Sequence, residues 1–424
     1  MRTMNKIKFL RSKLKFFSDI YNGNSIPDDK KDSFVNKKIP YIATKNIDAD
    51  THQIDYENGL SVNEDDGFRI AKTKSSLLCI EGGSAGKKLG YLNQEVAFVN
   101  KLCCFTPKNI DSKFLFYSLQ SSDFLSEFSL HLTGMIGGVK IGEIKNLYIS
   151  HPDDLGEQHK IACFLDRKIG QIDNLISNQE KQIEKLKEYR QAIITKAVTK
   201  GLDPNVPMKD SGVEWIGKIK QDYHCEKLKF LLSSPMLYGA NESGGKQEKG
   251  CTRFIRITDI DSNGNLKDTN DNQYLSASKS MGYILKNKDI LFARSGGTVG
   301  KSFLYKNPGF PCSFAGYLIK AECEETLLLP EFLYYYTKSS LYEIWKNMIF
   351  VQSTIQNIGA QRYGNLDIVI PSIAEQKQMV QYIDKKCMLI NKLIDIKSRT
   401  RKQLLDFKQS LIYEYVTGKK RVSL

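Results

Sequence analysis

The chain contains a long internal repeat. The segment from Glu157, EQHKIACFLDRKIGQIDNLI, recurs from Glu375 as EQKQMVQYIDKKCMLINKLI, at an offset of 218 residues. The same offset aligns Val198-Thr199 with Val416-Thr417, so the similarity extends over residues 157–199. Because the two copies must fold alike, this repeat constrains the fold more than composition does and predicts a molecule with pseudo-two-fold symmetry.

The segments that precede the two repeats are also related, but less closely. Glu81-Gly-Gly-Ser-Ala-Gly-Lys87 corresponds to Ser295-Gly-Gly-Thr-Val-Gly-Lys301 at an offset of 214, and Phe114-Leu-Phe-Tyr117 corresponds to Phe332-Leu-Tyr-Tyr335 at 218. Between these anchors the copies share little sequence. This pattern indicates one scaffold that carries two different specificities.

Each repeat predicts a long amphipathic helix, because it lacks proline and its apolar residues recur about every 3.5 residues, as in a coiled-coil seam. The seam predicted in the first copy is Ile161, Leu165, Ile172, Leu175, Leu186, Tyr189 and Ile193. The seam predicted in the second copy is Met379, Ile383, Ile390, Leu393, Leu404, Phe407 and Leu411. Polar residues interrupt both seams at the same place, Gln179 and Gln182 in one and Lys397 and Thr400 in the other.

A helix of about forty residues is roughly 60 Å long, since each residue adds about 1.5 Å. Two such helices packed antiparallel would hold one globular domain at each end and act as a spacer. The alternative is a pair of coiled-coil helices used for dimerisation. The equal lengths and the shared register favour the spacer.

The predicted fold class is α+β, with two mixed α/β domains joined by two long antiparallel coiled-coil helices in a pseudo-two-fold arrangement. Short strand-like runs such as Pro40–Ala43 and helical pieces at Lys113–Leu130 and Pro330–Asn347 support the mixed domains. The predicted boundaries are residues 1–153 for the first domain, 154–200 for the first helix, 201–221 for a connector, 222–372 for the second domain and 373–424 for the second helix and tail.

The balance of charge favours a polyanionic partner. Lysine and arginine number 62 against 48 acidic residues, which gives a formal net charge of +14. The nine cysteines form no CxxC pair, which is typical of reduced thiols, and no apolar run approaches the length of a membrane span. We therefore expect a cytoplasmic protein that does not bind a membrane.

The glycine-rich segment Ser295–Ser302 resembles a nucleotide-binding P-loop, but serine stands at position 295, where that motif requires its first glycine. The first copy has Lys88 where a magnesium-binding Ser or Thr is needed. We interpret both segments as tight turns between strands, whose backbone amides and lysine can approach a DNA phosphate. A turn without a ligand stays the alternative.

Motifs for covalent chemistry are missing. The sequence has no HExxH and no GxSxG, and the spacing of its five histidines suits no metal site. We expect neither a catalytic residue nor a metal or cofactor on this chain.

The whole pattern resembles the specificity subunit of type I restriction-modification systems. The residues that carry the resemblance are the EQ pair that begins each helix, the FLD and YID segments, the VT near each helix end, the junction TKGLDPNVPMKDSGVEWIGKI and the C-terminal LIYEYVTGKKRV. The resemblance implies that each domain is a target recognition domain reading one half of a split, asymmetric sequence in double-stranded DNA.

The resemblance also implies the partners. The helices would set the spacing between the half-sites and bind two modification subunits, which supply S-adenosylmethionine and methylate adenine. Restriction subunits, with ATP and Mg, would add translocation and cleavage. The residues expected in the spacer and partner-binding helices are Ile161, Leu165, Ile172, Leu186, Met379, Ile383, Ile390 and Leu404.

DNA contacts require Lys or Arg for phosphates, and Arg, Lys, Asn, Gln, Ser or Thr for base edges. The candidates in the first domain are Lys45, Lys87, Lys88 and Lys140. Those in the second domain are Arg256, Arg294, Lys301, Gln352, Gln356 and Arg362, of which Arg294 is the first choice for a base contact.

Two other classes of protein are compatible with parts of the sequence. A nucleoside triphosphatase would need a complete phosphate loop, and Gly296–Ser302 counts against it. A coiled-coil adaptor that binds proteins without reading DNA would account for the helices. It would not account for the basic charge or for two diverged domains.

Overall fold

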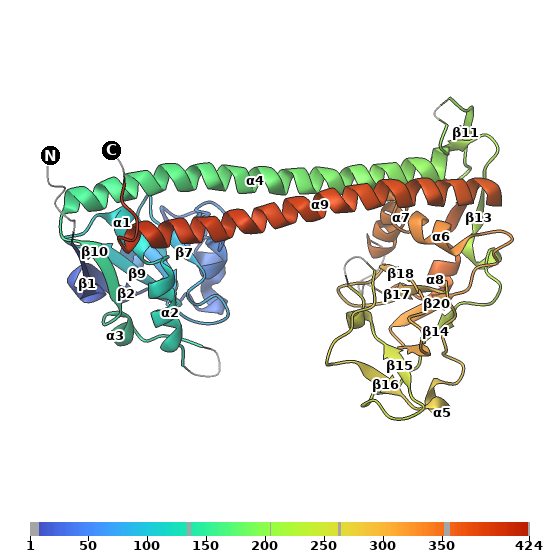
Figure 1. The fold of residues 1–424 in the computed structure, drawn as a ribbon, viewed down its shortest axis with the longest axis horizontal. Helices are drawn as coiled ribbons and strands as arrows, with labels where there is room; N and C mark the ends of the chain where they lie inside the picture. The colour runs from blue at the N-terminus through green and yellow to red at the C-terminus, as the bar shows by residue number, and fades with distance from the viewer. Residues whose placement is uncertain (1–7, 134–136, 204, 262–263, 352–356, 423–424) are drawn as a thin grey trace. The chain divides into compact units, whose positions relative to one another are not determined.

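The computed structural model describes residues 8–133, 137–203, 205–261, 264–351 and 357–422 of the 424-residue chain. The chain forms two compact units, the first comprising Met1–Gln182 with Lys397–Leu424 and the second comprising Ile183–Ile396. There are two long helices, α4 (Leu155–Lys200) and α9 (Ile373–Val416) (Figure 1). Each helix contributes one segment to the first unit and one segment to the second.

The first unit contains three small sheets. One has the order β2 (Ser18–Asn22), β9 (Leu102–Pro107), β6 (Ser76–Cys79) and β7 (Leu89–Tyr91). Another has the order β4 (Leu60–Val62), β3 (Ile39–Ile42), β8 (Val96–Phe98) and β5 (Ile70–Ala71). The third pairs β1 (Phe9–Lys13) with β10 (Tyr148–Pro152). All neighbouring strands are antiparallel except β3 and β8.

The second unit repeats this topology. Its four-stranded sheet has the order β14 (Leu237–Tyr238), β20 (Leu318–Ala321), β17 (Ile290–Ala293) and β18 (Ser302–Leu304). Its three-stranded sheet has the order β16 (Gln273–Leu275), β15 (Thr252–Ile255) and β19 (Cys312–Phe314), of which β15 and β19 are parallel. Strands β13 (His224–Lys227) and β21 (Asp367–Ile370) pair as β1 and β10 do.

Short helices complete both domains. The α-helices are α1 (Ser112–Ser118), α2 (Ser122–Leu130), α3 (Ile141–Ile144), α5 (Ala277–Ser280), α6 (Pro330–Tyr336), α7 (Ser340–Val351) and α8 (Ala360–Gly364). The 3₁₀ turns are Leu14–Phe16, Asp28–Ser33, Thr44–Asn46, Glu64–Asp66, Leu228–Phe230 and Ile257–Asp259.

The helical pieces predicted at 113–130 and 330–347 are confirmed, and the structure shows that each range contains two helices. Ser121 ends the first piece, since its side chain accepts a hydrogen bond from the amide of Phe124 and caps α2. Ser339 lies at the equivalent break, and its hydroxyl accepts a hydrogen bond from the amide of Tyr342. A serine that caps a new helix at its N-terminus favours a break in the chain direction there.

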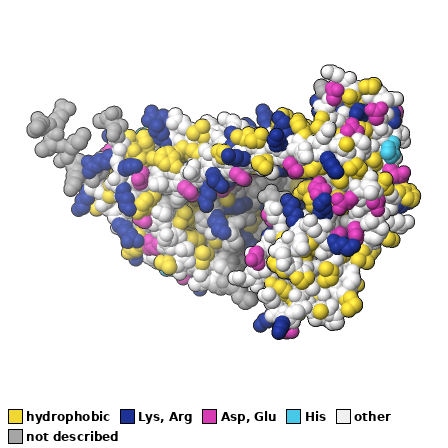
Figure 2. All heavy atoms as spheres, turned by 45° about the vertical axis from the view of Figure 1, so that its right-hand side comes forward, with side chains coloured by type: hydrophobic (Ala, Val, Ile, Leu, Met, Phe, Trp, Pro, Cys, Tyr) yellow, Lys and Arg dark blue, Asp and Glu magenta, His cyan; other side chains and the backbone are white. Residues whose placement is uncertain are grey.

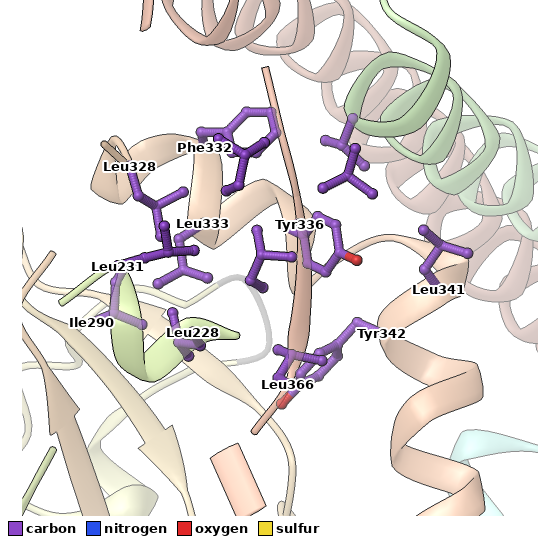
Figure 3. Close-up of a cluster of buried hydrophobic side chains, with 14 of the residues drawn as sticks. Leu228, Leu231, Ile290, Leu328, Phe332, Leu333, Tyr336, Leu341, Tyr342 and Leu366 are labelled. Carbon is purple, nitrogen blue, oxygen red and sulfur yellow. The ribbon is translucent and has the colours of Figure 1, made fainter. Parts of the chain in front are cut away.

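Each domain packs its sheet against its own helices. In the second unit, Leu228, Leu231 and Ile290 lie against Leu333 of α6 and Tyr336 in one cluster of buried side chains (Figure 3). The same core includes residues near the end of α4, namely Ile194, Ala197 and Val198. The helix pair is therefore part of the hydrophobic core of the unit and not a separate appendage.

The two long helices run antiparallel. In the first unit the Nζ of Lys408 lies 2.8 Å from Asp173, and Arg401 lies 2.6 Å from Glu180. Residue numbers therefore decrease along α9 in the direction in which they increase along α4. Lys397 donates a hydrogen bond to Gln182. In the second unit Arg190 donates to Asn391 at 2.6 Å. The polar interruptions of the seam are thus partly paired across it.

Four of the predicted seam residues were wrong. Leu175, Tyr189, Leu393 and Phe407 are exposed. The buried row of α4 continues from Leu165 through Ile169, Ile172 and Ile176, with the spacing of four and three residues that keeps one face toward the partner helix. Leu175 lies one residue away from that row and faces solvent.

A buried glutamine fixes the start of each long helix to its domain. Gln158 accepts a hydrogen bond from the amide of Asp111 at 2.9 Å and donates to the carbonyl of Pro152. Gln376 does the same with Leu329 and Pro371, 218 residues later. The glutamine of the repeated EQ pair therefore satisfies backbone groups that would otherwise be buried without partners.

A tyrosine in each domain makes a second contact with its helix. The hydroxyl of Tyr117 donates to Asp166 at 2.6 Å, and the hydroxyl of Tyr335 donates to Asp384. The residues of both pairs are related by the 218-residue offset, so this contact is part of the shared scaffold.

The segment between the two copies is ordered where the structure describes it. Strands β11 (Met208–Asp210) and β12 (Lys218–Lys220) form a hairpin. Ile216 is buried in the core of the second unit. At the end of the hairpin, Lys220 forms an ion pair of 2.7 Å with Glu375.

The predicted α+β fold with two mixed domains and two long antiparallel helices is confirmed. Among the described residues, all nine cysteines are free, and no helix is both long and apolar enough to cross a membrane.

Candidate nucleic-acid interface

The glycine-rich segments are hairpin turns. One connects β6 to β7 and the other connects β17 to β18, and both strand pairs are antiparallel. Gly82 and Gly86 have positive φ angles of 83° and 74°, and Gly296 and Gly300 have 77° and 82°, a conformation that favours glycine. A P-loop instead joins a strand to a helix, so these turns have a different architecture.

Several backbone amides of these turns are used internally. The amide of Gly300 donates to the carbonyl of Ala293, and that of Lys301 donates to Thr298. Gly86 and Lys87 make the equivalent hydrogen bonds in the first domain. The side chains around the turns are therefore better placed than these amides to contact a ligand.

The structure gathers the four predicted lysines of the first domain around one turn. Lys88 donates to the carbonyl of Thr44 at 2.7 Å, which brings the exposed Lys45 close to the turn. Lys87 is exposed and donates to the carbonyl of Gly83. Lys140 is also exposed, and it follows Val139, whose amide donates to Ile80 just before the turn.

The predicted residues of the second domain are less uniform. Arg294 and the exposed Lys301 flank the turn, and the exposed Arg362 donates to the carbonyl of Asn357. Arg256 is held by Asp259 at 2.9 Å and by Asp271 at 3.0 Å, so its charge is already neutralised. Gln352 and Gln356 lie outside the described residues.

Arg294 lies in a cluster that the sequence did not reveal. Its guanidinium lies over the ring of Tyr238, 5.0 Å from the centroid, and Tyr238 accepts a hydrogen bond from the amide of Ala360. The amide of Arg294 donates to the carbonyl of Tyr317, whose side chain is 65% exposed. Asn357 forms a β-bridge with Ser295 beside it. These four residues, Tyr238, Arg294, Tyr317 and Asn357, are here named the arginine cluster.

Two polar atoms of the arginine cluster lack partners. The Nε of Arg294 and the Oδ1 of Asn357 are buried and have no hydrogen-bond partner among the described residues. An unpaired buried donor or acceptor costs about 1–3 kcal/mol. Such atoms in an otherwise paired structure point to a ligand or to bound water.

The first domain has the same backbone and different side chains at this place. Ile80 occupies the position of Arg294, since its amide donates to Lys101 and its carbonyl accepts from Val139, as Arg294 does with Tyr317 and Ile358. The two domains therefore present different chemistry at equivalent positions. No local signal in the sequence connects Tyr238, Tyr317 and Asn357 with Arg294, because the four residues come from separate segments.

Basic side chains occur well beyond these turns. Figure 2 shows lysine and arginine spread over one face of the molecule, with acidic and hydrophobic side chains among them. Among the residues that the structure describes, no group of three or more His, Cys, Asp or Glu residues could hold a metal ion.

Comparison with known proteins gives consistent results. The family model described as "Type I restriction modification DNA specificity domain" matches residues 8–187 and 241–406. The MjaVIII type I restriction enzyme specificity subunit of Methanocaldococcus jannaschii is 25% identical over 366 residues, covering 83% of this chain and 80% of that protein. The StySPI specificity subunit of Salmonella potsdam is 32% identical over 137 residues, covering 31% of this chain and 28% of that protein.

A solved chain shows the same fold. It comes from work on complex assembly and conformational transition of the type I R-M system, and it aligns with a TM-score of 0.69 at 12% identity, covering 97% of this chain and 98% of that chain. Because the family model matches both copies of the repeat and most of the sequence, the chain belongs to the family of type I restriction-modification DNA specificity subunits.

Proposed function

We propose that this chain selects the DNA target of a type I restriction-modification complex by reading a split, asymmetric sequence. Each domain would read one half, and the long helices would set the spacing between the halves. The observation that carries this proposal is that two domains with one topology differ in side chains at equivalent turn positions, Ile80 against Arg294. Two different readers on one scaffold suit two different half-sites.

Within this proposal, Arg294 reads a base edge. Arginine can donate two hydrogen bonds to O6 and N7 of guanine in the major groove. The ring of Tyr238 holds the guanidinium in one orientation, which lowers the entropic cost of the contact. Lys45, Lys87, Lys88, Lys140, Lys301 and Arg362 would contact phosphates and position the domains.

The helices provide surfaces for partner subunits. Several large apolar side chains of α4 and α9 are exposed, among them Tyr189, Met388 at 70%, Leu389 at 59% and Phe407. We propose that such residues dock two modification subunits, which recruit restriction subunits. The predicted residues Ile161, Leu165, Ile172, Met379, Ile383 and Ile390 are buried, and Leu186 and Leu404 are partly buried, so their part would be to hold the helices together.

The chain would then perform no covalent chemistry. S-adenosylmethionine would bind the modification subunits, and ATP and Mg would bind the restriction subunits. The proposal assigns this chain the choice of sequence and the placement of the catalytic partners on it.

Single-molecule mapping of DNA methylation tests the proposal. Genomic DNA from cells expressing this chain with its modification subunit should carry methylated adenine in two short blocks separated by a fixed, unread gap. Cells lacking only this chain should lose that pattern. Unchanged methylation in the deletion, with an active modification subunit, would instead favour a protein adaptor that does not read DNA.

A further inference from the structure

The second unit contains a polar pocket of about 530 Å³, and of the residues that line it the proposed DNA reading uses Lys301 alone. It lies between the glycine turn at Gly300, the helices α6 and α7, and the facing segments of α4 and α9. Its walls include the rings of Tyr334 and Tyr335. The pocket lies wholly within one unit, so its shape depends on one packed core.

Positive charge is in excess in this pocket. Five cations line it, Lys187, Arg190, Lys301, Lys338 and Lys346, against three carboxylates, Glu184, Glu188 and Glu343. Lys187 pairs with Glu184, and Lys346 pairs with Glu343. Among the described residues, no carboxylate lies within salt-bridge distance of Arg190, Lys301 or Lys338. The surplus is therefore two positive charges, five minus three.

The neighbouring cations of the pocket affect the pKa of Lys338. Burial, together with the neighbouring cations Lys301, Arg190 and Lys346, lowers the pKa of Lys338 to about 8, against the opposing effect of Glu343. Its Nζ donates one hydrogen bond, to the carbonyl of Ser302 at 3.0 Å. An ammonium group has three donors, and this one also lies over the ring of Tyr334, 4.6 Å from the centroid, so at least one donor stays available to a ligand.

The equivalent pocket of the first unit is balanced in charge. It has a volume of about 460 Å³ and is lined by Lys113 and Lys408 against Asp166 and Asp173. Lys408 corresponds to Arg190 at the 218-residue offset, and it pairs with Asp173 at 2.8 Å. Asp173 corresponds in turn to Asn391, the neutral partner of Arg190. Gln120 stands where the second unit has Lys338.

The difference is thus specific to the second unit. The scaffold places a cation from the opposite long helix in both pockets, and in the described part of the chain only the cation of the first unit, Lys408, is paired with a carboxylate. A cavity lined by arginine and lysine side chains that have no carboxylate partner is suited to a tetrahedral oxyanion, because these side chains donate charge-assisted hydrogen bonds.

We propose that the second-unit pocket binds a phosphate group, held by Arg190, Lys301 and Lys338. The group could belong to free phosphate or a small phosphate ester, or to the backbone of DNA, and these sources share the chemistry that the pocket recognises. The inference goes beyond sequence reading, because it requires no base contact and no particular half-site.

Calorimetric titration of the full chain with sodium phosphate at pH 8 and constant ionic strength tests the site. We expect saturable binding with a dissociation constant on the order of 1 mM. The bound anion should raise the pKa of Lys338, so the protein should take up protons. The measured enthalpy should then change with the ionisation enthalpy of the buffer.

Two variants in the pocket should weaken binding by different means. Lys338→Met removes a ligand and should lower the affinity at least about tenfold and abolish the buffer dependence. Asn391→Asp gives Arg190 the carboxylate that Lys408 already has in the first unit, and it should lower the affinity several-fold. The second change introduces a pairing that this chain already accommodates, so it should preserve the fold.

Lys113→Met in the balanced pocket of the first unit is the matched control and should leave phosphate binding unchanged. Absence of saturable phosphate binding, or equal binding by the original chain, Lys338→Met and Asn391→Asp, would overturn the proposal. Either result would leave DNA recognition standing, because methylation mapping tests that separately.

DNA titrations at several salt concentrations distinguish the two sources of phosphate. If the pocket holds a backbone phosphate, Lys338→Met should weaken binding to all duplexes and reduce the salt slope by about 1. Phosphate should also compete with DNA. If the pocket holds a free phosphate or ester, Lys338→Met should lose phosphate binding with the DNA affinity and its salt slope unchanged.

Discussion

In the first unit the residue before the glycine turn is Ile80, whereas the equivalent residue in the second unit is Arg294. The backbone hydrogen bonds around these two residues are the same. Where the domains meet the helices, the two units instead use identical side chains, Gln158 and Gln376. The comparison teaches that the helix contacts define the scaffold and that side chains near the turns can change without altering it.

The largest expected effect on stability comes from substitutions that break the contacts shared by the two units. Gln376→Ala leaves the amide of Leu329 and the carbonyl of Pro371 without their buried partner, and Gln158→Ala does the same to Asp111 and Pro152. Each change should lower the free energy of unfolding by about 3 kcal/mol, as measured by urea denaturation. The exposed Gln171→Ala is the control. A large effect in only one unit would contradict the equivalence of the two contacts.

The next effect concerns specificity. Arg294→Ile places the residue of the first domain in the second, and it should cost about 2 kcal/mol of discrimination at one base pair in one half-site. Methylation mapping should show a relaxed second half and an unchanged first half. The exposed Lys306→Ala should leave both halves intact. A relaxed first half would show that the domains do not read separately.

A smaller effect depends on pH and distinguishes the first unit. Burial, together with the nearby charge of Lys408, lowers the pKa of His52 to about 4. The unfolded chain therefore binds a proton below about pH 6.5 that the folded chain does not bind, so stability falls as the pH drops from 6.5 to 4.

At pH 5.5 this loss should be about 1 kcal/mol relative to pH 7.5. His52→Asn should remove it, because asparagine does not titrate in this range. Asparagine also tolerates the positive φ of 60° at this residue. Denaturation of both proteins at the two pH values measures the difference. The same pH dependence in both would show that His52 is not its source.

The smallest effect should be equal in the two units. Tyr117→Phe and Tyr335→Phe each remove one hydrogen bond to an aspartate of the following helix, and each should cost about 1 kcal/mol in thermal unfolding. Tyr189→Phe, on an exposed face of α4, should cost nothing measurable. Unequal costs for the first two changes would show that the helix contacts have diverged as well.

The sequence predicted the long helices because their signal is local and occurs twice. It misplaced Leu175, Tyr189, Leu393 and Phe407 because a period near 3.5 allows neighbouring rows of apolar residues. Packing against the partner helix selects the row that contains Ile176. The EQ pair was visible in the sequence, but the backbone groups that Gln158 and Gln376 satisfy were not.

The candidate site was only partly predictable. Arg294 and Lys301 were chosen because they flank a glycine turn, and they do flank it. Tyr238, Tyr317 and Asn357 come from three distant segments, and only the pairing of strands brings them to Arg294. The ion pairs of Arg256 with Asp259 and Asp271 likewise depend on the fold.

The division of the chain into units has a consequence for synthesis. The second unit is continuous, from residue 183 to residue 396, whereas the first needs residues 397–424 to complete its core. Ile412 and Val416 of that segment are buried among residues of the first unit. As domains tend to fold while the chain emerges from the ribosome, the second unit can finish while the first still exposes the surface that α9 will cover. The domain that is translated first is the last to be completed.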